Sequence, residues 1–162
     1  MYKDVEEYIK ICYECQIRGG LKKNNPIWMI PPIDLFQRWE IDIVGSLPMT
    51  ENGNRYIIIM VDYFNRWPKD KPLRQANATS VVTFIYKEIV CRFGPPKVIQ
   101  SDQGTYFVNQ VIEQLTEKFR IKHSLLLTYH PQSNGLIERF NRTLCEGIVK
   151  VADTVLDWNK MI

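Results

Sequence analysis

The chain has 162 residues, of which 45% are hydrophobic and 12% aromatic, so it suits one domain with a buried core. Its net charge of +3 is compatible with a nucleic-acid partner but too small to indicate one by itself. No apolar run approaches the length of a membrane span and no signal peptide begins the chain, which predicts a soluble intracellular protein with no membrane partner.

The first 36 residues divide into a helical segment and an extended one. Apolar residues at helical spacing predict a short helix over residues 2–18, which ends near Gly19 and Gly20. Three prolines follow and predict a linker over residues 21–36. The boundary of the compact domain is therefore expected near residue 36.

Three strands are expected next. Apolar and acidic residues alternate over residues 39–43, which predicts a strand that buries one face and projects Asp42 from the other. An Asn-Gly pair at residues 52–53 indicates a hairpin turn into a continuous apolar strand over residues 56–61. A third strand around Trp67–Leu73 would complete an antiparallel meander.

Helices and strands then alternate. Apolar residues three and four apart predict a helix that Thr79 caps and Gly94 ends. The remaining elements are expected to be a strand over residues 97–101 that ends at Asp102, a helix over 107–119, a strand over 121–127, and a helix that starts at Ser133 or Asn134 and runs to about residue 153.

This order of elements predicts an α/β fold. A hairpin unit followed by strand–helix–strand crossovers gives a mixed five-stranded sheet flanked by helices, the arrangement of ribonuclease H-like domains. Sites in such sheets gather at the carboxyl ends of parallel strands, and Asp102 directly follows such an end.

Three acidic residues lie on three separate elements: Asp42, Asp102 and Glu138, with thirty-five residues between the last two. Mg²⁺ prefers oxygen ligands and keeps several waters, and two ions about 3.5–4 Å apart support in-line displacement at phosphorus. The pattern therefore predicts a two-metal phosphodiester site that uses Mg²⁺ or Mn²⁺. Any single acid of this kind would ordinarily be solvated surface. Asp62, at the end of the second expected strand, is interpreted as a residue that caps a turn and not as a ligand.

Four segments carry a more specific signal: Trp39–Gly45, Val61–Trp67, Arg92–Gly104 and Tyr129–Thr143. Together they resemble the catalytic core of retroviral-type integrases, most closely that of gypsy-type long-terminal-repeat retrotransposons. The resemblance covers residues 37–158. It implies that Asp42, Asp102 and Glu138 are the catalytic, metal-binding acids, with the spacing of that family between the last two.

The resemblance also implies a DNA-contacting segment around Glu138. Carried over residue by residue, it indicates Tyr129, Gln132, Asn134 and Arg142. Two interpretations of Arg142 stay open, a contact with a DNA phosphate and an ion pair with Glu138 one helical turn away. DNA ends and target DNA are the implied partners. Joining two ends to one target implies at least a dimer, acting in the nucleus on host DNA.

The amino-terminal Cys12 and Cys15 resemble half of a zinc site. Residues 1–20 would then be a remnant of the zinc-binding module of that family, whose two histidines are expected upstream. A structural zinc site needs four protein ligands, so this pair is expected to bind zinc poorly.

The main functional hypothesis is a polynucleotidyl transferase that processes the DNA ends of an element and joins them to target DNA. A second hypothesis is a catalytically silent relic or domesticated domain that binds nucleic acid or protein. The missing histidines and the lack of a carboxyl-terminal module after Trp158 favour the second. A host ribonuclease of the same fold is a third, disfavoured by the Pro-Gln-Ser-Asn-Gly segment at residues 131–135.

Overall fold

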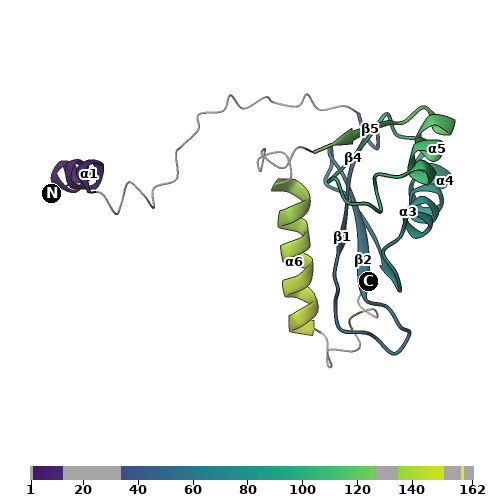
Figure 1. Cartoon of the computed structure of the whole chain (residues 1–162), viewed down its shortest axis with the longest axis horizontal. Helices are drawn as coiled ribbons and strands as arrows, with labels where there is room; N and C mark the ends of the chain where they lie inside the picture. The colour runs from purple at the N-terminus through teal and green to yellow at the C-terminus, as the bar shows by residue number, and fades with distance from the viewer. Residues whose placement is uncertain (1, 13–33, 127–134, 152–157, 159–162) are drawn as a thin grey trace. The chain divides into compact units, whose positions relative to one another are not determined.

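The computed structural model describes residues 2–12, 34–126, 135–151 and 158 (Figure 1). The chain divides into two compact units, Met1–Pro31 and Pro32–Ile162. Within the first unit, helix α1 spans Tyr2–Ile11 and exposes the apolar side chains of Val5, Tyr8 and Ile11. It ends earlier than the predicted helix over residues 2–18, of which residues 13–18 lie outside the described ones.

A mixed five-stranded sheet forms the centre of the second unit, as predicted. Its strands are β1 (Arg38–Val44), β2 (Tyr56–Asp62), β3 (Pro68–Leu73), β4 (Val98–Ser101) and β5 (Lys122–Leu125). They lie in the order β3-β2-β1-β4-β5, with β1–β2 and β2–β3 antiparallel and β1–β4 and β4–β5 parallel. The topology is that of the ribonuclease H-like fold predicted from the element order.

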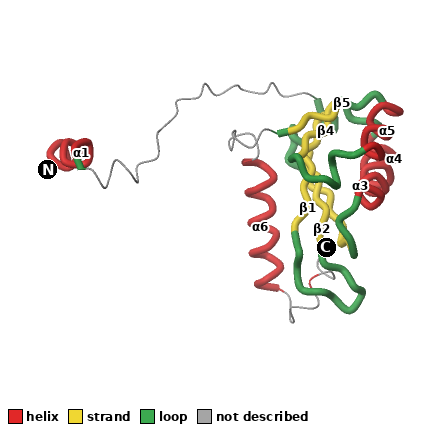
Figure 2. Tube along the Cα trace, in the orientation of Figure 1, coloured by secondary structure: helices red, strands yellow, loops and turns green. Residues whose placement is uncertain are grey.

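Helices cover both faces of this sheet (Figures 1 and 2). On one face lie α3 (Ala78–Phe84), the π-helical segment η1 (Ile85–Val90) and α4 (Cys91–Phe93), which follow one another without a break, together with α5 (Gln110–Phe119). On the other face lies α6 (Gly135–Val151).

Two predicted helix starts were wrong by two or three residues. Asn77, and not Thr79, caps α3, because its side chain accepts a hydrogen bond from the Ser80 N–H. The helix predicted from residue 107 begins at Gln110, where the Asn109 side chain accepts hydrogen bonds from two backbone N–H groups. In both places an asparagine upstream satisfies the unpaired N–H groups of the first turn.

Each face of the sheet has its own apolar cluster. Trp39, Ile41 and residues of α3, η1 and α5 form the larger cluster. Ile57, Ile59 and Val61 of β2 pack with Ile137 of α6 and with Trp158, whose indole N–H donates to the Pro48 carbonyl. Successive residues of β1 and β2 therefore alternate between the two faces.

Asp62 has the turn-capping role predicted for it. Its carboxylate is fully buried and accepts hydrogen bonds from the backbone N–H groups of Phe36 and Asn65. Among the residues described, no helix has the length and apolar character needed to cross a membrane.

Candidate active site

Strand β1 carries Asp42 on the face of the sheet that meets α6. The preceding odd-numbered residues, Trp39 and Ile41, are buried in the opposite cluster. Since alternate residues of a strand point to opposite faces, Glu40 and Asp42 project toward α6 together with Val44, which packs against the α6 cluster. This is the orientation that the alternating pattern predicted for Asp42.

Two hydrogen bonds fix the Asp42 carboxylate. Its Oδ1 accepts from the Ile43 backbone N–H at 2.7 Å, and its Oδ2 accepts from Asn141 Nδ2, also at 2.7 Å. Asn141 lies on α6, one turn after Glu138. The second bond therefore ties the first strand to the helix that carries the third acid.

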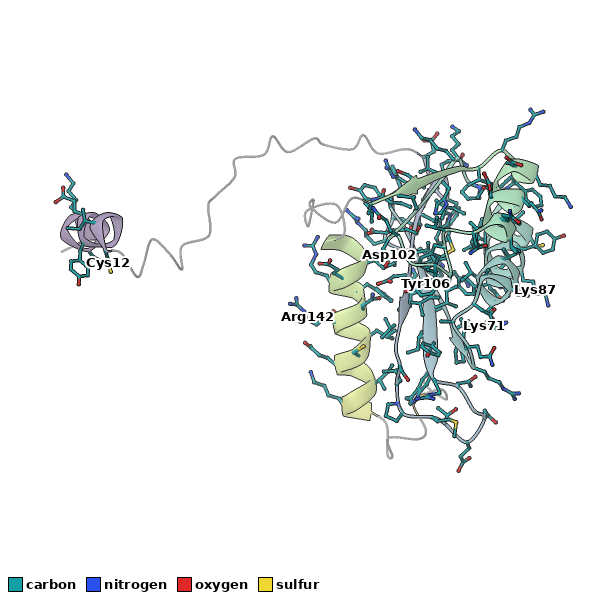
Figure 3. All side chains as sticks on the ribbon, in the orientation of Figure 1. Cys12, Lys71, Lys87, Asp102, Tyr106 and Arg142 are labelled. Carbon is teal, nitrogen blue, oxygen red and sulfur yellow. The ribbon has the colours of Figure 1, made fainter. Side chains whose placement is uncertain are left out.

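Asp102 follows the end of β4, the parallel neighbour of β1. The register pairs Arg38 with Val98 and Glu40 with Gln100, and two more steps of the same register place Asp42 opposite Asp102. The Asp102 Oδ1 accepts a hydrogen bond of 2.9 Å from the Gly104 N–H. Sequence order and register thus bring Asp42 of β1 next to Asp102, which directly follows the end of the neighbouring strand β4. Figure 3 labels Asp102 at this end of the sheet.

Glycine is required at position 104 by close packing. A Cβ atom there would lie 2.8 Å from the Tyr106 ring and 3.0 Å from Asp102 Oδ1. Any side chain would therefore displace the tyrosine or the carboxylate. The turn after β4 depends on this residue to hold Asp102 in place.

Glu138 lies in the first turn of α6 and is exposed. Burial raises the pKa of Asp42, and the negative charges of Asp102 and Glu138 raise it further, while hydrogen bonds from Ile43 and Asn141 lower it. Asp42 is therefore close enough to both other acids for their charges to act on it. The structure brings the three predicted acids into one electrostatically coupled group.

The donor set fits a hard divalent cation, because every acidic group here offers carboxylate oxygens and a cation would relieve their mutual repulsion. In the described residues, however, no three His, Cys, Asp or Glu side chains approach closely enough to hold a single metal ion.

A fourth acid, Glu40, was missed in the sequence. Its side chain is 2% exposed, and neither carboxylate oxygen has a hydrogen-bond partner. Burial raises its pKa to about 7, helped by the charges of Asp42 and Glu138 and opposed by Arg66. The Ile137 backbone N–H also lowers the pKa, without making a hydrogen bond of regular geometry. Its position two residues before Asp42 on a strand was the available signal.

Tyr106 was also missed. Its ring packs edge-on against the buried Phe107, and the pKa of its phenol is raised by burial and by the charges of Asp102 and Asp42. The aromatic ring therefore forms one wall of the acidic group, close to Asp102 (Figure 3).

Of the predicted DNA contacts, only Arg142 can be located. It is exposed on α6 and forms no ion pair with Glu138, although the structure describes both side chains. The other three, Tyr129, Gln132 and Asn134, lie outside the described residues. Of the predicted zinc half-site, Cys12 directly follows α1, and Cys15 lies outside the described residues.

His123, on β5, contacts the end of the neighbouring strand β4. Its Nε2 lies 2.8 Å from the Ser101 hydroxyl, which in turn donates to the Asp102 carbonyl. This chain of contacts joins β5 to the end of β4. It supports the backbone from which Asp102 projects.

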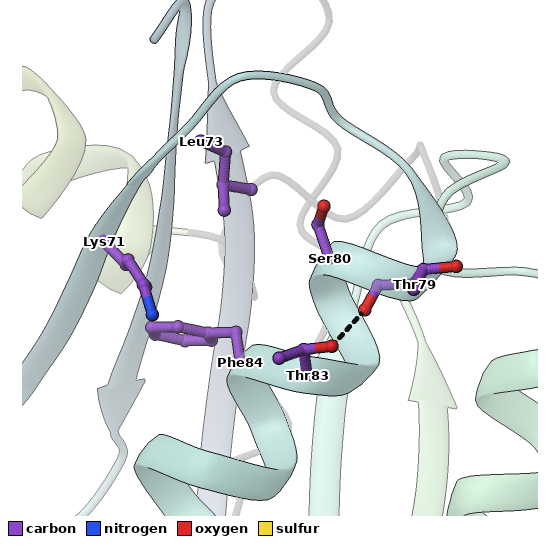
Figure 4. Close-up of a pocket in the computed structure, with 6 residues that line it drawn as sticks. All are labelled: Lys71, Leu73, Thr79, Ser80, Thr83 and Phe84. Carbon is purple, nitrogen blue, oxygen red and sulfur yellow. Dashed lines mark hydrogen bonds between the residues drawn. The ribbon is translucent and has the colours of Figure 1, made fainter. Parts of the chain in front are cut away.

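A cavity of about 180 Å³ lies apart from these acids, between β3 and α3 (Figure 4). It is lined by Lys71, Leu73, Thr79, Ser80, Thr83 and Phe84. The Thr83 hydroxyl donates to the Thr79 carbonyl on the helical side. With no carboxylate in this lining, the cavity offers none of the ligands that a hard cation prefers.

A family model and several curated relatives match this chain, and they agree on the family. The family model described as "Integrase core domain" matches residues 35–131. The Pol polyprotein of feline endogenous virus ECE1 is 41% identical over 76% of the chain, and the Gag-Pol polyprotein of woolly monkey sarcoma virus is 40% identical over 70%. The retrovirus-related Pol polyprotein from transposon 412 of Drosophila melanogaster is 30% identical over 98% of the chain.

The chain is much shorter than these relatives. It spans 12% of the feline virus polyprotein, 7% of the woolly monkey virus polyprotein and 13% of the transposon 412 polyprotein.

Proposed function

The chain belongs to the integrase core domain family, and from this premise we propose that it is the catalytic core of a DNA integration reaction. In this reaction the core processes the DNA ends of an element and joins each end to target DNA. The supporting observation is the coupling of Asp42, Asp102 and Glu138 on one face of the sheet.

The acidic group would hold two divalent cations, Mg²⁺ or Mn²⁺. When bound, such ions assist the attacking oxygen and stabilise the leaving oxygen of an in-line displacement. Asp42 and Asp102, on adjacent strands, and Glu138 on α6 would supply the carboxylate ligands. Asn141 would keep Asp42 oriented by its hydrogen bond to Oδ2.

The bond changes of the joining step balance without any other reactant. The 3′-hydroxyl oxygen of the element end attacks a target phosphorus, and the bond from that phosphorus to the target 3′-oxygen breaks. The hydroxyl proton passes to solvent and the leaving oxygen becomes a new 3′-hydroxyl. Hydrolysis of the element end follows the same course with water as the nucleophile.

DNA would contact the segment around Glu138 through Tyr129, Gln132, Asn134 and Arg142. Arg142 supports this proposal because it is exposed and is not engaged by Glu138. At least two copies would be needed to join two ends to one target, and the reaction would take place in the nucleus.

A disintegration assay tests the proposal, since it reverses the joining step on a branched DNA substrate. We expect the 162-residue chain to release the element end in the presence of Mn²⁺ and to stop in EDTA. Asp102→Asn should abolish the reaction, whereas Glu113→Gln, an exposed acid on α5, should leave it unchanged. DNA binding without metal-dependent turnover would instead support the non-catalytic alternative, and cleavage of RNA in hybrids would support a ribonuclease.

A further inference from the structure

Two acids are buried in the described part of the fold, and they differ in their surroundings. Asp62 accepts backbone hydrogen bonds on both carboxylate oxygens, from Phe36 and Asn65. Glu40 is buried to a similar degree, yet both of its carboxylate oxygens have no partner. A buried carboxylate without partners is costly, and a hydrogen-bond donor or a cation beside it would offset this cost.

The neighbours of Glu40 make this cost larger. It lies two residues before Asp42 on the same face of β1, so two carboxylates stand next to each other on the face that α6 covers. Neither carboxylate oxygen of Glu40 pairs with the guanidinium of Arg38 or Arg66, although Arg38 precedes it on the same face. A positive charge beside the two carboxylates would offset their repulsion.

Further unsatisfied groups lie around the same acids. The buried Arg38 Nε and Asn141 Oδ1 also have no hydrogen-bond partner. Arg38 precedes Glu40 by two residues on the same face of β1, and Asn141 holds Asp42. In the described residues, the buried side-chain atoms without a partner therefore all belong to β1 or α6, the two elements that carry Asp42 and Glu138.

We propose that Glu40 is a fourth acidic residue of the cation site and accepts hydrogen bonds from water molecules carried by bound Mg²⁺ or Mn²⁺. The proposal rests on the metal-dependent function proposed above. Mg²⁺ keeps several of its waters in protein sites, and those waters are donors that the two Glu40 oxygens lack.

The test is a titration of the full chain with MnCl₂ in the absence of DNA, with free Mn²⁺ measured by electron paramagnetic resonance. We expect Glu40→Gln to weaken Mn²⁺ binding by about tenfold or more, the usual effect of losing an outer-shell partner. Asp70→Asn is the matched control, because Asp70 is a partly buried acid on β3, outside the site. Its Mn²⁺ affinity should equal that of the wild type.

Asp42→Asn separates this inference from the proposed function. One outcome overturns the inference and leaves the proposed function standing. In that outcome the wild type binds Mn²⁺, Asp42→Asn does not bind it, and Glu40→Gln binds it as tightly as the wild type. If the wild type binds no Mn²⁺, both fail. Weaker binding in both variants supports both.

A second variant covers the case in which Glu40→Gln does not fold, which circular dichroism would reveal. Glu40→Asp keeps the charge and shortens the side chain by one methylene, so the carboxylate no longer reaches the cation waters. We expect weaker Mn²⁺ binding here as well, and an affinity equal to that of the wild type would overturn the inference.

Discussion

The two faces of the sheet have different chemistry although the same strands build both. Toward α3 and α5, β1 contributes Trp39 and Ile41, which are buried in a continuous apolar cluster. Toward α6, the same strand contributes Arg38, Glu40 and Asp42, and β4 adds Gln100 beside Glu40. The α6 face is apolar at β2 and polar at β1 and β4.

This difference suggests that different residues stabilise the fold and carry out the proposed reaction. Apolar burial stabilises the fold on one face, while unpartnered polar atoms collect on the other, where packed apolar residues would have been more stable. Functional sites commonly depart from optimal packing in this way. Changes in the apolar cluster against α3 and α5 should therefore affect stability, and changes at Asp42 and Asn141 on the α6 face should affect activity. Glu40, on the same α6 face, should affect stability in a way that depends on pH.

The largest expected effect is a loss of stability from a substitution on the face that α3 and α5 cover. Trp39→Ala should lower the free energy of unfolding by about 3–5 kcal/mol, because it opens a cavity in the larger cluster. Trp67→Ala, at a tryptophan that is 52% exposed, should change it little. Urea unfolding followed by circular dichroism measures both, and equal losses would contradict the assignment of the core to Trp39.

Glu40, on the face that α6 covers, should make the free energy of unfolding depend on pH. Its pKa is raised from 4.5 to about 7 on folding, so the folded protein binds more protons than the unfolded chain between these values. The contribution of Glu40 to stability is therefore most favourable below pH 4.5 and is lost as the pH rises through about 7.

Glu40→Gln should remove this loss in metal-free protein. In EDTA, the free energy of unfolding of Glu40→Gln relative to that of the wild type should rise by about 3 kcal/mol between about pH 4 and about pH 8. Urea unfolding at the two pH values measures the difference. A gap that stays constant with pH would show that Glu40 does not carry the shift.

Asp42→Asn should reduce activity without reducing stability, in contrast to Trp39→Ala, which should reduce stability. Metal-dependent disintegration should fall on the order of 10²-fold, equivalent to about 3 kcal/mol, because a metal ligand is lost. The free energy of unfolding should not decrease, since the substitution also removes repulsion from Asp102 and Glu138. If Asp42→Asn is inactive because it is unfolded under the assay conditions, the proposed difference between the two faces is wrong.

The smallest effect is expected for Asn141, which orients Asp42 without belonging to the acidic group. Asn141→Ala should reduce the same activity by about tenfold, or about 1.4 kcal/mol. Thr143→Ala is the control, because Thr143 is an exposed residue of α6 whose hydroxyl donates to the Arg139 carbonyl of the same helix. Equal activities of the two variants would rule out a positioning role for Asn141.

The sequence predicted the elements that local patterns determine. Alternation placed Asp42 on the face opposite Trp39 and Ile41, and the continuous apolar run predicted the strand β2, which the structure buries on both faces. The start of α3 was misplaced because Asn77 and Thr79 are both good capping residues, and only the backbone geometry distinguishes them.

What the sequence did not predict depends on contacts between distant segments. Glu40 is buried on a face that α6 covers, almost one hundred residues later, so a local pattern shows an ordinary polar strand residue. Tyr106 reaches the acids only because the turn at Gly104 allows its ring to pack there. The hydrogen bond from Asn141 to Asp42 has the same long-range origin.

The central claim is that the α6 face of the sheet holds divalent cations between β1, β4 and α6. Crystals of the chain soaked in MnCl₂ and measured at the manganese absorption edge test it most directly. If cations bind between these elements, anomalous density is expected beside the carboxylates of Asp42 and Asp102. Manganese bound only elsewhere on the protein, or no anomalous density beside these two residues at saturating MnCl₂, would contradict it.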